Sequence, residues 1–357
     1  MIEEFNTVVQ LEKEWKQISS QNNINYCQSY SWTRYTEIFC SSNFFKRLYF
    51  GKIKYFALYR EDKCQIIIPV QLNGKVGNLL GWRTPNDYEG ILFSSNLVKD
   101  DIKEIFDYIF SKYSLEKLNC GLITPKQNNI VPLLEYLTTL GYKIEKNDSF
   151  NVALTYNYEN FNHYFNSLSK STRQNYRTSL NRLNKDKRLF DFYFYEDKIP
   201  EQEVECFLSD HKDRLKTRYL KARSPIVEYV LSPTRLLIYG KYRRDGIAAL
   251  SMRGLNRQIL AIMKIDGRNA AYYYGVLCKT QGEGERINFF RVCVNEKDFG
   301  FYSPGMVLGV EIIKKYQNRF RVYDFTKGDE AYKYKLGCQN EEDFFIVIKN
   351  QEKILNN

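Results

Sequence analysis

The order of the predicted secondary-structure elements constrains the fold most, because it occurs twice along the chain. Up to residue 156, apolar spacing predicts two helices, three strands, and then a helix, a strand, a helix and a strand. Beyond that point the pattern of helices, strands, helix and strand starts again. A chain of 357 residues is long enough for about two domains. We therefore expect two α/β halves, residues 1–150 and 151–357.

Three runs in the second half are expected to form an antiparallel meander. Gly246–Gly254, Gln258–Asp266 and Ala270–Val276 are each apolar or alternating, and the gaps between them contain Gly or Asn. The other elements predicted nearer the C-terminal end are a helix at Met306–Tyr316 and strands at Arg321–Phe325 and Asp343–Lys349.

The composition argues against several classes of protein. No apolar run approaches the roughly 20 residues of a membrane-spanning helix, and the N-terminal stretch is acidic and polar rather than a signal peptide, so a cytoplasmic protein is expected. The eight Cys are scattered without a CxxC pair and there are only two His, so we expect reduced thiols and no metal site. His163 and His211 give no persuasive Ser/His/Asp triad, and no Walker or dinucleotide glycine pattern occurs.

The chain is basic, since Lys and Arg exceed Asp and Glu by 11. Such an excess favours anionic partners, such as nucleotides, phosphorylated ligands, RNA or acidic lipid surfaces. A basic surface that is merely solvated explains the same count, so both interpretations stay open.

The segment FYSPGMVLGVEII, residues 301–313, predicts a helix whose first turn can bind an anion. Ser303 suits the N-cap, Pro304 suits the first helical position, and Gly305 leaves the backbone uncovered. The N–H groups and the dipole at such a helix start can bind a pyrophosphate. A well-formed helix start without a ligand is the alternative.

The helix predicted after Leu168 carries a row of cations. Lys170, Arg173 and Arg177 fall at i, i+3 and i+7, on one face beside an apolar stripe. Such a row suits a ligand with a phosphate or a carboxylate. Further Arg and Lys residues make the helix basic nearly all round, so a solvated basic helix is the alternative.

Two other stretches gather charges beside aromatic side chains. The loop within residues 81–93 brings Asp87 next to Tyr88, and a carboxylate there can be a general base or a member of an ion pair. Val322–Gly337 begins as a strand and then concentrates Asp, Glu and Lys, which suits either a site at a sheet edge or a solvated turn. Gln281–Arg286 looks like a phosphate loop, but its two Glu would repel phosphate, so we interpret it as a flexible turn.

Taken together, these stretches resemble the GNAT-type acyltransferases of the CelD/BcsL kind, which are related to the Fem (FemABX) transferases. The resemblance covers nearly the whole chain. Its most specific marks are Arg173 and Arg177, Ser303-Pro304-Gly305, and the string Asp324-Phe325-x-x-Gly328-Asp329-Glu330-x-Tyr332-Lys333. It implies an α/β (α+β) chain with two tandem GNAT-like domains, each a mixed, mostly antiparallel sheet flanked by helices.

The resemblance also implies roles for individual residues. The donor, acyl-CoA (acetyl-CoA above all), would bind in the second domain. Lys333 would steady the charge that develops at the acyl carbon, and Asp87 would be the base. The residues expected at the donor's pyrophosphate are Ser303, Gly305, Met306 and Val307, and those expected at the acceptor are Tyr88, Arg173, Arg177, Asp324 and Asp329. The usual Gln/Arg-x-x-Gly-x-Gly/Ala loop is missing before the helix, which is a departure from the GNAT pattern.

The expected function is therefore an N-acyltransferase that uses acyl-CoA. Its acceptor would be a small molecule, amine-bearing and anionic, such as an amino sugar, a nucleotide-sugar or another cell-envelope precursor. A Fem-like transferase that uses aminoacyl-tRNA is the related alternative, although no long helical pair like the Fem coiled-coil arm is visible. A basic RNA-binding module without catalysis is the alternative from another class. The sequence does not determine the oligomeric state.

Overall fold

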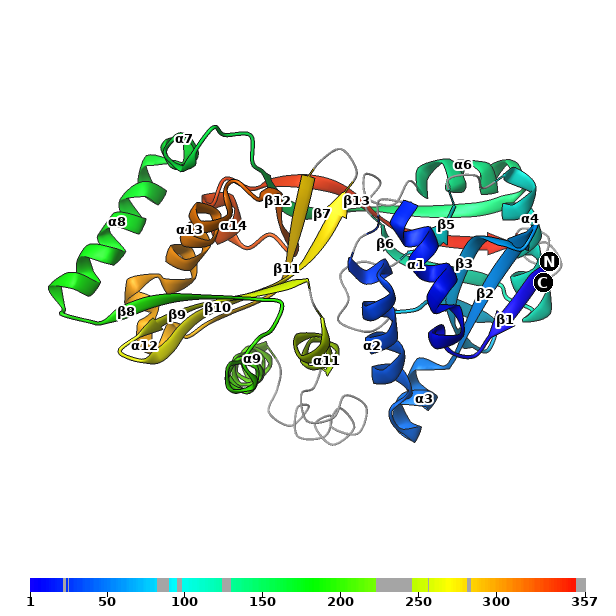
Figure 1. The fold of residues 1–357 in the computed structure, drawn as a ribbon, viewed down its shortest axis with the longest axis horizontal. Coiled ribbons are helices and arrows are strands. Elements are labelled where there is room, and N and C mark those ends of the chain that lie inside the picture. Colours follow the sequence, from blue (N-terminus) through cyan, green and yellow to red (C-terminus); the bar gives the residue numbers. More distant parts are fainter. Residues whose placement is uncertain are drawn as a thin grey trace. The chain divides into compact units, whose positions relative to one another are not determined.

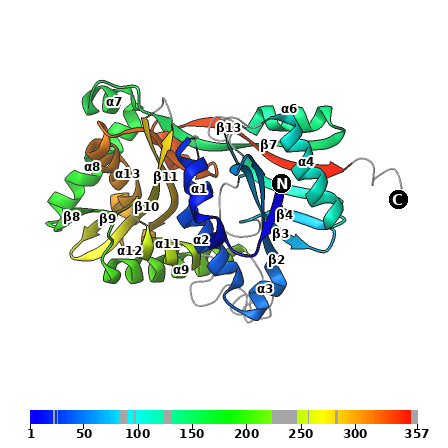
Figure 2. The ribbon, with the colours of Figure 1, turned by 45° about the vertical axis from the view of Figure 1, so that its right-hand side comes forward.

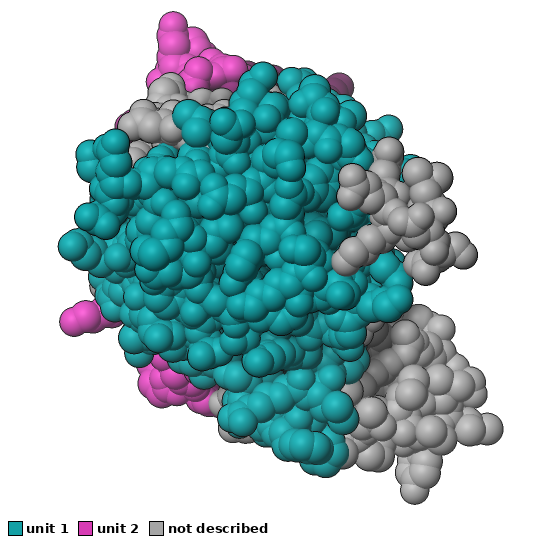
Figure 3. All heavy atoms as spheres, turned by 90° about the vertical axis from the view of Figure 1, so that its right-hand side faces the viewer, with its two compact units in different colours: residues 1–150, 236–240, 342–357 teal, residues 151–235, 241–341 magenta. Residues whose placement is uncertain are grey.

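The computed structural model describes residues 1–21, 24, 26–81, 90–94, 98–123, 130–222, 246–255, 257–280 and 284–350. Contacts between residues divide the chain into two compact units, which Figure 3 colours separately. The first unit contains Met1–Phe150 and the residues from Glu342 onward, and the second contains the described residues from Asn151 to Glu341. Whether these units are the two domains expected at 1–150 and 151–357 stays a prediction.

The first unit is built on a sheet with one parallel pair of strands. Its order is β1-β2-β3-β4-β6-β13, and β5 pairs with β3. The bounds are β1 (Ile2–Phe5), β2 (Lys52–Arg60), β3 (Lys63–Asn73), β4 (Val76–Leu79), β5 (Leu92–Phe93), β6 (Lys117–Ile123) and β13 (Gln339–Asn350). Neighbouring strands are antiparallel except for β4 and β6, which are parallel and have helix α4 (Lys99–Lys112) between them in the chain.

Helices bury both faces of this first sheet. Besides α4 they are η1 (Val8–Leu11), α1 (Glu12–Gln21), η2 (Tyr26–Gln28), α2 (Tyr30–Ser41), α3 (Phe44–Phe50) and α6 (Ile130–Thr139). On β2, Tyr55 packs in the same cluster as Trp15 of α1, whereas Phe56 packs in the cluster that contains Ile105 of α4. Because successive strand residues point to opposite faces and both faces are covered, β2 and β3 have nearly continuous apolar sequences.

The second unit has a sheet of the same kind. Its order is β7-β12-β11-β10-β9-β8. The bounds are β7 (Tyr142–Thr155, in this unit from Asn151), β8 (Phe190–Glu196), β9 (Gln258–Ile265), β10 (Arg268–Thr280), β11 (Gly284–Val294) and β12 (Phe320–Lys327). All neighbours are antiparallel except for β11 and β12, which are parallel.

Helices lie on both faces of the second sheet as well (Figures 1 and 2). They are α7 (Phe161–Ser167), α8 (Lys170–Lys185), α9 (Glu201–Ala222), α11 (Gly246–Gly254), α12 (Glu296–Phe299), η4 (Gly300–Tyr302), α13 (Pro304–Tyr316) and α14 (Ala331–Lys335). Tyr272 and Tyr274 of β10 contact the ring of Phe207 on α9, whereas the hydroxyl of Tyr273, between them, donates to the Gly305 carbonyl of α13 at 3.0 Å. The crossover helix α13 and helix α9 therefore cover opposite faces.

The predicted fold class is confirmed, since both units have mixed, mostly antiparallel sheets flanked by helices, but one predicted strand is wrong. Gly246–Gly254 forms helix α11. A short apolar run has no periodicity that separates a buried strand from a buried helix, and this one contains Ala248 and Ala249, which favour a helix. The third strand of the meander is instead β11, whose first residues, Gly284 to Arg286, had been interpreted as part of a turn.

Candidate active site

The parallel strands β11 and β12 pair only over their first halves. Their register runs from Glu285 opposite Phe320 to Asn288 opposite Asp324. Beyond Asn288, β11 continues to Val294 in register with β10, and β12 continues to Lys327. The two strands are thus neighbours up to Asn288 and Asp324 and no longer paired at their carboxyl ends, which is where ligands bind in sheets with a parallel pair.

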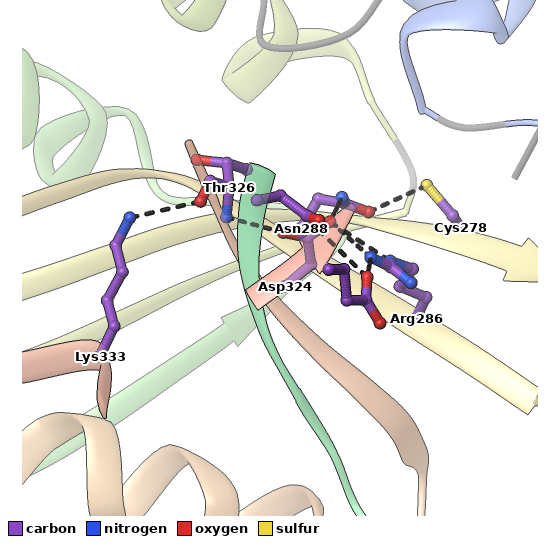
Figure 4. A network of polar contacts seen from close by, with 8 residues as sticks. Cys278, Arg286, Asn288, Asp324, Thr326 and Lys333 are labelled. Carbon is purple, nitrogen blue, oxygen red and sulfur yellow. Dashed lines mark hydrogen bonds and ion pairs between the residues drawn. The ribbon is translucent and has the colours of Figure 1, made fainter. Parts of the chain in front are cut away.

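A buried cluster of charged and amide side chains lies where this pairing ends (Figure 4). Arg286 Nη2 contacts Asp324 Oδ2 at 2.9 Å and Glu341 Oε2 at 2.6 Å. Asn288 Nδ2 donates to the same Asp324 oxygen at 2.6 Å, and Cys278 Sγ donates to Asn288 Oδ1 at 3.4 Å. The side chains of Arg286 and Asp324 are 1% and 0% exposed. A buried cation therefore bridges two carboxylates, and loss of the cation would leave both uncompensated.

The backbone of β12 is distorted immediately after Asp324, where its register with β7 shifts. Thr326 has a φ of 57°, a left-handed conformation that a β-branched residue rarely adopts. Its N–H donates to Asp324 Oδ1 at 2.7 Å, and its carbonyl accepts from Lys333 Nζ at 3.4 Å. Backbone strain of this kind costs about 1–3 kcal/mol and persists only where neighbouring groups enforce it. Asp324 and Lys333 therefore hold a strained turn at the end of β12.

Lys333 is buried by this turn, with its side chain 3% exposed. Besides Thr326, its ammonium donates to the carbonyls of Lys327 and Gly328, each at 3.0 Å, and it lies 3.0 Å from Glu330 Oε2. An ammonium group has three donors, so these contacts occupy all of them. Burial also raises the pKa of the neighbouring Cys338 thiol, although Lys333 opposes this, so Cys338 is a neutral thiol.

The start of α13 is the second part of the candidate site. Ser303 stands at the N-cap with a left-handed backbone, but its hydroxyl does not cap the helix, unlike the expectation. Its carbonyl accepts from the amides of Met306 and Val307, each at 3.1 Å, and both of these residues are buried. Gly305 is half-buried, and a Cβ there would lie 2.7 Å from Val294 Cγ2. Ser303 and Gly305 are therefore the parts of the expected pyrophosphate site that solvent still reaches.

Tyr273 connects the start of α13 with the segment that carries Lys333. Its hydroxyl bonds to Gly305, and its ring contacts that of Tyr332 at a centroid distance of 6.4 Å. The Ser303 turn and the Tyr332-Lys333 segment thus lie against one tyrosine side chain on the same face of the second sheet. This proximity was expected from the sequence only through the resemblance.

Two of the other predicted site residues, Arg173 and Arg177, contact helix α7 and the residue that follows it. Arg173 donates from Nη1 to the carbonyls of Asn166 and Leu168, at 2.6 and 2.5 Å, and so closes the end of α7. The Arg177 guanidinium lies 5.5 Å from the centre of the Phe165 ring. Asp329 is exposed. Asp87 and Tyr88 lie outside the described residues, so their roles stay predictions.

Sequence reasoning missed Arg286 and Asn288. Both belong to a strand in which Ile287 and Phe289 are apolar, so the polar residues recur with period two. That alternation was the available signal. It was overlooked because the preceding glycines and glutamates suggested a turn.

One known protein family matches the part of the chain that contains the candidate site. Residues 170–334 match the acetyltransferase (GNAT) domain family. The matched segment contains α13, Arg286, Asp324 and Lys333. No curated protein matches the sequence significantly.

Solved structures share the fold of almost the whole chain at low sequence identity. One is a conserved protein of unknown function from Bacteroides thetaiotaomicron VPI-5482, with 10% identity and a TM-score of 0.58, covering 98% of this chain and 100% of that one. Another is the C-terminal domain of a putative lysylphosphatidylglycerol synthetase from Agrobacterium fabrum, with 13% identity, a TM-score of 0.51 and coverages of 98% and 94%. A third is L-PGS from Bacillus licheniformis, with 10% identity, a TM-score of 0.54 and coverages of 95% and 91%.

Among the described residues, no group of three His, Cys, Asp or Glu side chains is arranged to hold a metal ion. Within the same part of the chain, no helix is both long and apolar enough to span a bilayer.

Proposed function

We propose that the protein is an N-acyltransferase that moves an acyl group from acyl-CoA, acetyl-CoA above all, to an amine. The observation that carries the proposal is that several unusual features lie together in one part of the second unit. The segment that matches the GNAT domain contains the point where β11 and β12 cease to pair, and the buried charge cluster, the strained Thr326 turn and the start of α13 all adjoin it. Perturbed geometry and buried charge gather at functional sites more often than elsewhere.

The donor would bind between the diverging strand ends and the start of α13. A helix start attracts phosphate through its dipole, and no acidic residue lies in the first turn of α13 to oppose this. The Met306 and Val307 amides already donate to the Ser303 carbonyl, so the Gly305 amide is the one proposed to contact the phosphate. Ser303 and Gly305 would lie nearest the pyrophosphate. The chain lacks the usual Gln/Arg-x-x-Gly-x-Gly/Ala loop before this helix. The attraction for phosphate remains, because the backbone of α13 provides it.

The reaction forms a C–N bond and breaks a C–S bond. The neutral amine attacks the thioester carbon, the carbonyl oxygen becomes an oxyanion, and the thiolate leaves while the nitrogen loses a proton. Asp87 stays the proposed base, directly or through water. Lys333 can hold the oxyanion only if it releases one of its present partners, which are three carbonyls and the Glu330 carboxylate. Otherwise it supports the reaction by fixing the Thr326–Gly328 turn beside the acyl group.

The acceptor is proposed to be small, anionic and amine-bearing, such as an amino sugar, a nucleotide-sugar or another cell-envelope precursor in the cytoplasm. Arg177 is the exposed cation proposed to contact it, together with Tyr88, because Arg173 already closes α7. A CelD/BcsL-like role would fit such an acceptor.

One observation favours an aminoacyl-tRNA donor as the second candidate. Helix α8 and the residues that follow it expose several cations, namely Lys170, Arg177, Lys185, Lys187 and Arg188. A basic helix of this kind can follow a phosphate backbone. The Agrobacterium fabrum neighbour is described as part of a putative lysylphosphatidylglycerol synthetase, and a lipid acceptor for this chain would be consistent with that description.

Thiol release from acetyl-CoA, measured with a panel of amine acceptors, tests the proposal. Thiol release that depends on the acceptor, together with coenzyme A retained in native mass spectrometry, is the expected result. Transfer that ribonuclease abolishes would replace acyl-CoA with aminoacyl-tRNA. Salt-sensitive RNA binding without any acyl transfer would indicate an RNA-binding module and would refute the proposed acyltransferase activity. In an active enzyme, Lys333→Ala separates its two roles, since an oxyanion role lowers kcat without lowering Tm, whereas support of the turn lowers both.

A further inference from the structure

We propose that helix α3 and its flanks dock the protein onto an anionic lipid membrane surface. We call this region the α3 surface and define it by Phe44, Phe45, Leu48, Arg47 and Lys52. It belongs to the first unit and does not depend on the proposed acyltransferase activity.

The apolar part of the α3 surface is unusually exposed. The exposed fractions of Phe44, Phe45 and Leu48 are 71%, 47% and 71%. The two Phe rings contact each other at 5.8 Å, and Leu48 lies one helical turn after them on the same side. Single exposed apolar residues are ordinary, but three within five residues form a patch that water contacts unfavourably.

The exposure is not caused by a loosely attached helix. Asn43 Oδ1 accepts from the Lys46 amide at 2.8 Å and so caps the start of α3, and Gly51 ends the helix with a φ of 82°. On the opposite side, Phe50 is 3% exposed, and the Lys46 ammonium lies 3.9 Å from the centre of the Phe39 ring of α2. The helix is thus fixed on the first unit with its apolar side facing outward.

The charges beside the patch have the sign that attracts anionic headgroups. Arg47 and Lys52 are exposed, and so is Arg34 on α2. The one acidic residue in the sequence from Arg34 to Lys52 is Glu37, which faces inward, where it accepts from the Tyr55 hydroxyl at 2.7 Å and the Val8 amide at 2.8 Å. The α3 surface therefore presents cations around an apolar patch, as interfacial membrane-binding helices do.

The same charges argue against a second copy of the chain as the occupant. A two-fold interface centred on α3 would bring Arg47 and Lys52 close to their own counterparts, and like charges repel. An anionic bilayer instead neutralises them while Phe44, Phe45 and Leu48 enter the headgroup boundary. One short helix gives weak, reversible attachment rather than permanent anchoring.

Vesicle co-sedimentation of the full chain tests the inference. The probes are vesicles of phosphatidylcholine alone and of phosphatidylcholine mixed equally with phosphatidylglycerol, at low and high salt. We expect binding to the anionic vesicles only, weakened by salt. Phe44→Ser with Leu48→Ser should lower the partition coefficient about 100-fold if both side chains are fully buried in the bilayer, because each buried apolar side chain contributes about tenfold. Arg47→Gln with Lys52→Gln should lower it roughly 25-fold, since each cation near an anionic surface contributes roughly fivefold.

Leu189→Ser is the matched control, because Leu189 is 76% exposed but lies in the second unit. It should bind like the wild type, and all variants should keep the wild-type melting temperature because the replaced side chains are exposed. The proposal is wrong if the wild type does not bind anionic vesicles, or if the α3 variants bind as well as Leu189→Ser does. A wild-type dimer that Phe44→Ser with Leu48→Ser converts to a monomer would make a second copy the occupant instead.

Discussion

The two units contain the same strand arrangement but place different side chains at its centre. In each unit a parallel pair, β4–β6 or β11–β12, is joined through a helix and flanked by antiparallel strands. In the second unit Asn288 stands opposite Asp324, and in the first unit Asn78 stands opposite Asn119. The Asn288–Asp324 pair of the second unit carries a charge. The Asn78–Asn119 pair of the first unit is neutral, with Asn119 Nδ2 donating to Asn78 Oδ1 at 2.7 Å.

This difference shows that the strand arrangement itself does not require buried ions. Val76 lies two residues before Asn78, where the second unit has Arg286 two residues before Asn288. A neutral pair therefore satisfies the same position of the sheet without a cation. Since a buried ion cluster is weak evidence for stability, the charges of the second unit are better explained by a role in its site.

The largest effect is expected when the cation is removed from the second unit. Arg286→Met removes the cation that pairs with the buried Asp324 and the partly buried Glu341, and loss of one member of a buried ion pair costs about 3–5 kcal/mol. The melting temperature of the variant, followed by circular dichroism, should fall steeply.

Adding Asp324→Asn and Glu341→Gln to Arg286→Met makes the centre of the second unit neutral, like that of the first. We expect the triple variant to regain most of the melting temperature, while its turnover stays at least about tenfold below that of the wild type. If the triple variant is as active as the wild type, the charges are not needed for the site and the comparison fails.

The reverse exchange introduces a charge into the first unit. Asn119→Asp places a carboxyl beside Asn78 with no arginine, in a position that is 8% exposed. Burial raises the pKa of this carboxyl above its unfolded value of about 3.9. The variant should therefore match the wild type below that pH and lose stability as the pH rises towards the raised pKa. A loss of stability that is equal at all pH values would indicate a packing defect rather than an uncompensated charge.

The crossover helices of the two units also differ at their starts, which leads to a medium-sized effect. Helix α4 begins with Asp100 and Asp101, whereas the first turn of α13 has no acidic residue. Gly305→Asp places an acidic residue in the first turn of α13, as in α4. It should raise KM for acetyl-CoA about five- to tenfold, because the carboxylate repels the pyrophosphate. Gly305→Ala is the control, because both substitutions place a Cβ near Val294. Equal KM values for the two variants would exclude an anion at this helix start.

The spacing of apolar residues predicted most individual helices and strands. It could not predict which residues distant in the sequence contact each other. The bounds of β6 and most of α13 were predicted correctly, because the spacing of apolar residues and the residues at a helix start are local features of the sequence. The left-handed Thr326 and the burial of Lys333 could not be predicted, since both depend on Asp324 and on a turn brought together by the fold. Arg286 was missed for the same reason, because a charged residue in a strand has a buried partner only after a distant strand pairs with it. The pairing of β13 with β6, more than 200 positions apart in the sequence, likewise leaves no local signal.

The smallest effect is expected at an ion cluster of the first unit that water still reaches. Partial burial alone would raise the pKa of Glu4, but hydrogen bonds from Lys112, Lys54 and Tyr113 lower it to about 2 from an ordinary value of 4.5. A lowered pKa stabilises the folded state above the ordinary value, and this contribution is lost as the pH falls from 4.5 towards 2. Glu4→Gln should therefore melt slightly below the wild type at neutral pH, and the difference should disappear near pH 2.

Glu116→Gln is the matched control for this experiment, because the Lys75–Glu116 pair is exposed at both ends and should contribute almost nothing. Solvent screens the Glu4 cluster, so its effect must stay well below that of Arg286→Met. If Glu4→Gln destabilises the protein as much as Arg286→Met does, then burial does not set the strength of these clusters, and the difference between the two units would need another explanation.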